Sequence, residues 1–141
     1  MHKIIAREIR SFEHFNDASI GATMRQPSLW DAFIDTDIDS TYGSRRYNIE
    51  VTLPPNYPFV PMRVRFITPI KNEYITSEGY LNLDILGTQW TPTYSIAAVL
   101  LSFASILNAC DIDNMRSRQV ARQEQIRAEL ISRIYQPTIE Q

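Results

Sequence analysis

Residues 46–61 read RYNIEVTLPPNYPFVP, a strand pattern that continues directly into a proline-rich corner. Apolar residues occupy every second position of its first half: Tyr47, Ile49, Val51 and Leu53. This period of two is typical of a β-strand in a sheet with one solvated face. The corner at 54–61 ends the strand, because proline has no N–H to donate to a neighbouring strand. The segment therefore predicts a sheet strand that stops at a fixed point.

Further elements are expected on both sides of this segment. Upstream, the spacing of Ile5, Ile9 and Phe12 predicts an amphipathic helix over 3–15, and alternation predicts a strand over 29–34. Downstream, alternation predicts another strand over 63–68. Short connections between the strands favour an antiparallel arrangement, so we expect an α+β fold with three or four meandering strands.

The C-terminal half begins with a long segment of little periodicity, 69–94, which we interpret as an ordered loop. Loops of this length in a compact domain are usually functional. Ser95 is the expected N-cap of a buried helix that runs to about 107. Its apolar residues have helical spacing: Ile96, Val99, Leu100, Phe103, Ile106 and Leu107. A second helix is expected over about 115–135, with five arginines between 116 and 133 on a face that is typical of solvated helices.

Length, composition and charge limit the class of protein. The 141 residues are 44% hydrophobic, which predicts a single domain over 1–141, and a net charge of −2 argues against a nucleic-acid partner. The longest apolar run, 96–101, is too short to span a membrane. Arg7 and Glu8 interrupt the N-terminus before the apolar region of a secretory signal peptide could form, so we expect an intracellular protein, cytoplasmic or nuclear.

The lone cysteine, Cys110, and the histidines His2 and His14 match no common metal spacing, so no metal site is predicted.

The proline-rich corner belongs to a longer set of motifs. It is followed by Val64-Arg65-Phe66, by Gly79-Tyr80-Leu81-Asn82-Leu83-Asp84-Ile85-Leu86, and by Trp90-Thr91-Pro92. Together these segments resemble the ubiquitin-conjugating enzyme family, with no gap between residues 53 and 107 and with about residues 3–115 covered. The resemblance implies an N-terminal helix, a four-stranded antiparallel meander, C-terminal helices and no cofactor.

Asn82 departs from the family pattern at its most important position. In the family motif Gly-x-Ile-Cys-Leu-Asp, the cysteine accepts ubiquitin as a thioester and passes it to a lysine. Asn82 occupies that position here. A carboxamide has no ionisable nucleophile near neutral pH, whereas a thiol supplies a fraction of thiolate. The resemblance therefore predicts that this chain does not form the thioester.

A second departure lies eight residues earlier. The family's His-Pro-Asn motif, whose asparagine is thought to stabilise the oxyanion, corresponds to Asn72, Glu73 and Tyr74. Tyr74 therefore stands at the position of the oxyanion asparagine, and Asn72 would take that role only if the loop shifted its register. The acidic residue beside the family's active site, in the loop after the long helix, corresponds to Asn114. The ungapped register predicts that Asn82 lies in a shallow groove on an extended loop, close to Tyr74 and within reach of the Asn114 loop.

Three functions remain open. We favour a natural inactive variant that binds partners in a ubiquitin or ubiquitin-like pathway. The first alternative is a conjugating enzyme whose cysteine has been substituted by Asn82 or replaced by another nucleophile such as Cys110. Cys110 follows the buried helix and lies beside Asp111, and is better explained as a structural cysteine. The second alternative is a structural module that kept the fold and left the pathway.

The resemblance also implies docking surfaces. Phe59 and Pro92 match the two loops by which the family binds RING-type ligases, although Phe59 is equally well explained by packing onto the core. Trp90 is expected to pack. Lys3, Arg7 and Arg10 match the helix face that meets the activating enzyme, and a merely solvated face is the alternative. The partners expected are the modifier, an active conjugating enzyme and a RING-type ligase.

Overall fold

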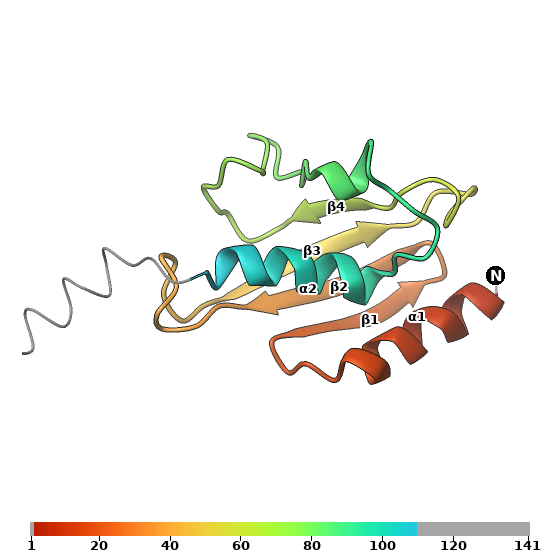
Figure 1. Ribbon diagram of the computed structural model, residues 1–141, viewed down its shortest axis with the longest axis horizontal. Helices are drawn as coiled ribbons and strands as arrows, with labels where there is room; N and C mark the ends of the chain where they lie inside the picture. The colour runs from red at the N-terminus through yellow and green to blue at the C-terminus, as the bar shows by residue number, and fades with distance from the viewer. Residues whose placement is uncertain (1, 110–141) are drawn as a thin grey trace, which may run out of the picture.

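The structure is a computed structural model, and residues 2–109 are described (Figure 1). Along the chain lie α1 (His2–Phe15), β1 (Ile20–Gln26), β2 (Leu29–Asp35), β3 (Arg46–Thr52), β4 (Arg63–Phe66), the 3₁₀ helix η1 (Asp84–Leu86) and α2 (Ile96–Leu107). The strands form one antiparallel sheet in the order β1-β2-β3-β4, and α2 lies across one face of it (Figure 1). The expected α+β meander is confirmed. The predicted helix over 115–135, Cys110 and Asn114 lie outside the described residues.

The core lies between the sheet and α2. The strand registers place apolar side chains in rows on one face, with Trp30 opposite Val51 and Val51 opposite Val64. The ring of Phe103 on α2 meets the ring of Phe66 on β4 edge to face, with centroids 5.6 Å apart. The fully buried side chains of α2 include Ile96, Val99, Leu100 and Phe103. Burial of this kind is the main stabilising contribution to the fold. No helix within residues 2–109 is long and apolar enough to cross a membrane.

The predicted strands agree with β2, β3 and β4 within two residues. β4 ends at Phe66 rather than at residue 68, because Ile67 and Thr68 both donate their N–H groups to the single carbonyl of Asn48. β1 was not located by alternation. The alternation of buried and exposed residues is lost in β1, because the second half of this edge strand, residues 23–26, is exposed on both sides.

Two predicted core positions were wrong. Ile9 is 48% exposed on α1, and the neighbouring side chain of Glu8 is completely buried instead. The face of α1 that packs on the core therefore includes Ile4, Ile5, Glu8 and Phe12. Ile106 on α2 is 40% exposed, because it faces away from the sheet side that holds Phe103 and Leu107. Helical spacing thus located both helices and most of their inward residues, and was wrong at one position in each, Ile9 and Ile106.

Glu8 joins three segments of the chain. The Tyr57 hydroxyl, in the proline-rich corner, donates a hydrogen bond to its Oε1 atom. The Ile96 N–H, at the start of α2, donates to its Oε2 atom over 3.2 Å. A neighbouring hydroxyl pair, Ser11 and Ser95, adds a 2.5 Å contact between the same two helices. Ser95 also accepts a hydrogen bond from the Ala98 N–H, which confirms it as the N-cap of α2.

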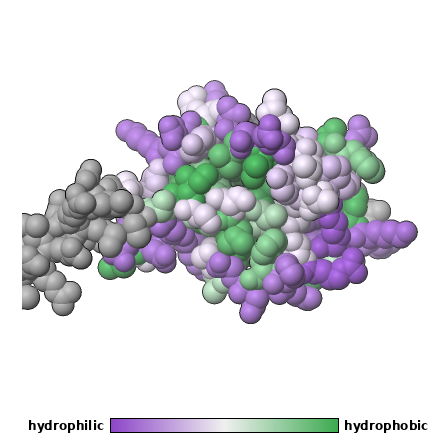
Figure 2. All heavy atoms as spheres, viewed as in Figure 1, coloured by the Kyte–Doolittle hydropathy of each residue, from purple (hydrophilic) through white to green (hydrophobic). Residues whose placement is uncertain are grey.

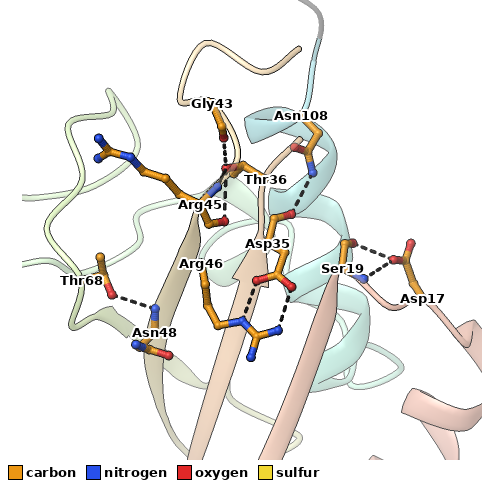
Figure 3. Close-up of polar contacts among 10 residues, drawn as sticks. All are labelled: Asp17, Ser19, Asp35, Thr36, Gly43, Arg45, Arg46, Asn48, Thr68 and Asn108. Atoms are coloured by element: carbon orange, nitrogen blue, oxygen red, sulfur yellow. Dashed lines mark hydrogen bonds and ion pairs between the residues drawn. The ribbon is translucent and has the colours of Figure 1, made fainter. Parts of the chain in front are cut away.

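The other end of α2 is fastened to the loop between β2 and β3. The Ser40 hydroxyl donates to the Leu107 carbonyl, and the Asn108 side chain accepts the Asp37 N–H at 2.7 Å. Asn108 also approaches the Asp35 carbonyl, beside the ion pair of Asp35 with Arg46 (Figure 3). Polar contacts at both ends thus fix the position of α2 along the sheet.

We predict that Glu8 makes stability depend on pH. Burial raises the pKa of Glu8 above its ordinary value of 4.5, while hydrogen bonds from Tyr57 and Ile96 and the charge of Arg7 partly oppose the rise. The folded state then holds the proton more tightly than the unfolded state. The contribution of Glu8 is therefore fully present below pH 4.5 and decreases as the pH rises through the folded-state pKa. A tenfold difference in proton affinity between the two states corresponds to about 1.4 kcal/mol of stability.

Glu8→Gln tests this prediction, because glutamine fills the same space and does not ionise. Urea unfolding of both proteins at several values between about pH 4 and pH 8 should show the wild type losing stability relative to the variant as pH rises. Parallel stability curves would contradict the prediction. Glu8→Ala should be less stable than Glu8→Gln at every pH, because it leaves a cavity and the buried Ile96 N–H without an acceptor.

Candidate functional site

Asn82 lies on an extended segment that is fastened to the edge of the sheet. The Phe66 N–H donates to the Gly79 carbonyl at 2.7 Å, and the Leu81 N–H donates to the Val64 carbonyl at 2.8 Å. The side chain of Asn82 is exposed, whereas those of Leu81 and Leu83 on either side are buried. Alternation within this short segment therefore directs Asn82 to solvent and anchors both of its neighbours.

Gly79 allows the segment to approach β4 this closely. Its φ angle is +94°, in the left-handed region that L side chains rarely adopt. A Cβ atom at this position would lie 2.6 Å from the carbonyl oxygen of Phe66, which is a backbone atom. The glycine of the Gly-Tyr-Leu-Asn motif is thus required by the path of the chain three residues before Asn82.

The structure brings Tyr74 and Asn82 together through the backbone. The Asn82 N–H donates to the Tyr74 carbonyl at 2.7 Å. The Tyr74 side chain is half-buried and packs against the core. The expected proximity of these two positions is therefore observed, while the loop of Asn114 lies outside the described residues.

The Asn72 side chain holds this loop in shape. Its Oδ1 atom accepts the Tyr74 N–H at 2.8 Å, and its Nδ2 atom donates to the Tyr42 hydroxyl oxygen at 2.7 Å. The Tyr42 hydroxyl in turn donates to the Lys71 carbonyl at 3.0 Å. Both ends of the Asn72 amide are therefore engaged within the loop that carries Tyr74.

The chemistry available around Asn82 is limited. Residues 2–109 contain no cysteine, and their histidines, His2 and His14, both lie on α1. No three His, Cys, Asp or Glu residues within this part of the chain come together as a metal site. The loop thus presents a neutral carboxamide, with neither a thiol nor an imidazole base on the surrounding described segments.

The proline-rich corner presents an exposed aromatic ring. Phe59 is 79% exposed, although Tyr57, two residues earlier, is buried. The Trp90 indole N–H donates to the Pro58 carbonyl at 2.9 Å, and its ring packs near Tyr57 and Tyr94. Trp90 thus packs as expected and holds the corner beside the exposed Pro92. Apolar groups project at the margin of the molecule over the loop between β3 and β4 (Figure 2).

The three cations of α1 have different surroundings. Lys3 and Arg10 are exposed. The Arg7 guanidinium instead donates to the carbonyls of Pro92, at 2.7 Å, and Tyr94. Arg7 is therefore more than a solvated charge, because it ties α1 to the turn that carries Pro92.

Consecutive residues of α1 thus hold the two exposed loops. Glu8 binds Tyr57 below the Phe59 loop, and Arg7 binds the backbone of the Pro92 loop. Sequence reasoning had missed both roles. The role of Glu8 could have been suspected from the sequence, because this glutamate stands among the apolar positions of a helix. The role of Arg7 could not, because every residue has a backbone carbonyl and the partners therefore form no sequence pattern.

Comparison with known proteins agrees with the fold and the motifs. The ubiquitin-conjugating enzyme family model matches residues 4–136. Among curated proteins, ubiquitin-conjugating enzyme E2 K of Homo sapiens and that of Bos taurus are each 41% identical over 86 residues. These 86 residues are 60% of this chain and 43% of the relative, so the match spans less than half the length of these relatives.

Solved structures share the fold at lower sequence identity. A ubiquitin-conjugating enzyme E2 from Plasmodium falciparum has a TM-score of 0.69 at 24% identity, covering 79% of this chain and 100% of that one. Human ubiquitin-conjugating enzyme E2 G1 has a TM-score of 0.66 at 21% identity, covering 73% and 90% of the two chains. With the family match extending over nearly the whole sequence, the chain belongs to the ubiquitin-conjugating enzyme family.

Proposed function

We propose that this protein is a catalytically inactive member of its family, which acts by binding partners in a ubiquitin or ubiquitin-like pathway. The observation that carries the proposal is Asn82, which stands at the motif position of the family's cysteine on an exposed, well-anchored segment. Thioester formation needs a thiolate nucleophile, and a carboxamide nitrogen is neutral and unreactive near pH 7. The position keeps its access to solvent and lacks the reactive atom.

The surroundings of Asn82 support the same proposal. Tyr74 occupies the oxyanion position with a half-buried side chain, and the amide of Asn72 is engaged with Tyr42 and Tyr74. A catalytic oxyanion donor has to point at the position where charge develops. The absence of such a donor would weaken the transfer of ubiquitin to a lysine even if a nucleophile at position 82 accepted the thioester.

The binding role rests on the Phe59 and Pro92 loops. The Phe59 ring is 79% exposed and therefore available to a partner, and the prolines beside it restrict the loop before binding. Aromatic anchors of this kind often contribute about 2 kcal/mol or more to an interface. We propose a RING-type ligase as the partner of these loops, with the activating enzyme or an acidic partner meeting Lys3 and Arg10 in the cytoplasm or nucleus.

One alternative has an observation in its favour. The backbone around Asn82 is intact, with Gly79, Leu81 and Leu83 in ordered positions, so a cysteine would fit there without rearrangement. The second candidate function is therefore that of a ubiquitin-conjugating enzyme whose own catalytic cysteine has been substituted by Asn82. A purely structural module is the third, and it would have no use for an exposed Phe59.

The wild-type protein should accept no ubiquitin thioester, because Asn82 cannot act as a nucleophile. Incubation with activating enzyme, ATP and ubiquitin, followed by a non-reducing gel, should show no band shifted by one ubiquitin and removed by thiol. Such a band would disprove inactivity, and its loss in Cys110→Ser would identify that cysteine as the nucleophile. Asn82→Cys is the matched variant, and it should gain the thiol-sensitive band.

Phe59→Ala should weaken binding to a RING domain by at least about tenfold, which corresponds to ~1.4 kcal/mol. Its melting temperature should stay nearly unchanged, because removing an exposed ring leaves no cavity in the core. Calorimetric titration and thermal unfolding measure the two effects separately.

Phe66→Ala is the control, because Phe66 packs against Phe103 in the core. It should cost roughly 3–5 kcal/mol of stability. If Phe59→Ala unfolds the protein while the affinity of the folded fraction is unchanged, Phe59 is a core residue and the docking proposal fails.

A further inference from the structure

The chain contains two Thr-Pro sequences with contrasting surroundings. Thr68, before Pro69, is half-buried, and its Oγ1 atom accepts the Asn48 N–H at 2.9 Å (Figure 3). The Thr68 N–H is also bonded to the Asn48 carbonyl, so both the hydroxyl and the N–H of this threonine are engaged with β3. Thr91, before Pro92, is exposed on the turn that precedes α2. Of these two threonines, Thr91 is therefore the one that is accessible to an enzyme.

The backbone at Thr91 suits a protein kinase of the proline-directed class. Such enzymes phosphorylate a serine or threonine that is followed by proline in an accessible, extended segment. Pro92 disfavours the helical region for Thr91 and biases it toward extended conformations. The Tyr94 N–H donates to the Thr91 carbonyl at 3.1 Å, which closes a turn that presents Thr91 and Pro92 outward.

The turn that carries Thr91 borders a basic hollow through Thr93. The Thr91 Oγ1 atom is 2.6 Å from the Thr93 Oγ1 atom. Thr93 in turn lines a hollow between α1 and α2 whose titratable residues are Arg7, Arg10 and His14, and the described lining includes no acidic residue. A phosphate dianion gains charge-assisted hydrogen bonds when arginines are within reach. The turn thus combines an accessible hydroxyl with cations suited to its modified form.

We infer that Thr91 is a phosphorylation site for a proline-directed kinase. The Thr91 hydroxyl oxygen forms a bond to the γ-phosphorus of Mg-ATP as the bond from that phosphorus to the ADP oxygen breaks. The hydroxyl proton passes to the catalytic aspartate of the kinase, so the products are phosphothreonine, ADP and one proton. Kinase and Mg-ATP are the only co-reactants.

The consequence of this modification rests on the proposed function. Pro92 follows Thr91 directly and forms part of the proposed ligase-docking surface with Phe59. A doubly charged group at the edge of an apolar contact disrupts it, because the charge loses water on binding. Phosphorylation should therefore weaken RING-domain binding at least tenfold.

The site itself is tested on the full chain by two proline-directed kinases of different subfamilies, each first shown to be active on a standard peptide. Intact mass and peptide mapping should show one phosphate on Thr91, lost in Thr91→Ala and strongly reduced in Pro92→Ala. Thr93→Ala is the matched control and should retain the phosphate. Phosphate on Thr68 instead, or none on Thr91, would overturn the inference.

The effect on docking is tested with a RING domain whose binding is weakened by Phe59→Ala. Titration should show at least tenfold weaker binding of the phosphorylated protein, and the phosphatase-treated sample should recover full affinity. If Thr91 is modified and affinity is unchanged, the regulatory consequence is wrong and the modification site stands. If Phe59→Ala weakens binding and Thr91 stays unmodified, the proposed function stands and this inference fails.

Discussion

The buried carboxylate of Glu8 is the constraint on which the arrangement of the molecule depends. Removing a carboxylate from water costs several kcal/mol unless hydrogen bonds compensate. Its two donors, Tyr57 and Ile96, lie 49 and 88 residues away along the sequence. The cost is therefore offset only when α1, the proline-rich corner and the start of α2 meet at one point. The neutral phenol contributes reliably, because burial and the neighbouring carboxylate raise the pKa of Tyr57.

The loops and the helix face proposed to bind partners are positioned by the contacts around Glu8. The corner that exposes Phe59 rests on buried Tyr57, and the Trp90 indole joins that corner to the following turn. Arg7, next to Glu8, binds the Pro92 and Tyr94 carbonyls of the same turn. One turn of α1 therefore sets the spacing between two loops that are separated by about thirty residues of sequence. Lys3 and Arg10 extend from the same helix into solvent.

Prediction from the sequence succeeded where a pattern repeats along the chain. The alternation of residues 46–53 and the helical spacing of residues 96–107 correspond to β3 and α2, because each repeat reports burial on one side of an element. It failed where burial depends on a distant partner. Ile9 is more apolar than Glu8, yet Glu8 is buried because Tyr57 and Ile96 supply hydrogen bonds that no local pattern contains. The motif register likewise predicted Asn82 on an extended segment close to Tyr74, whereas the hydrogen bond of Asn72 with Tyr42 could be found only from the fold.

The attachment of residues 79–81 to β4 has a consequence for motion. Gly79 and Leu81 exchange hydrogen bonds with Phe66 and Val64, so the segment before Asn82 behaves as an added strand of the sheet. Backbone groups paired in this way exchange their amide protons with solvent only when the pairing opens. The Leu81 and Phe66 amides should open together, as one cooperative unit with the edge of the sheet. Asn82 is thus as accessible as a loop residue, while the backbone before it opens as rarely as a paired strand. Its side chain therefore offers partners a surface of constant shape.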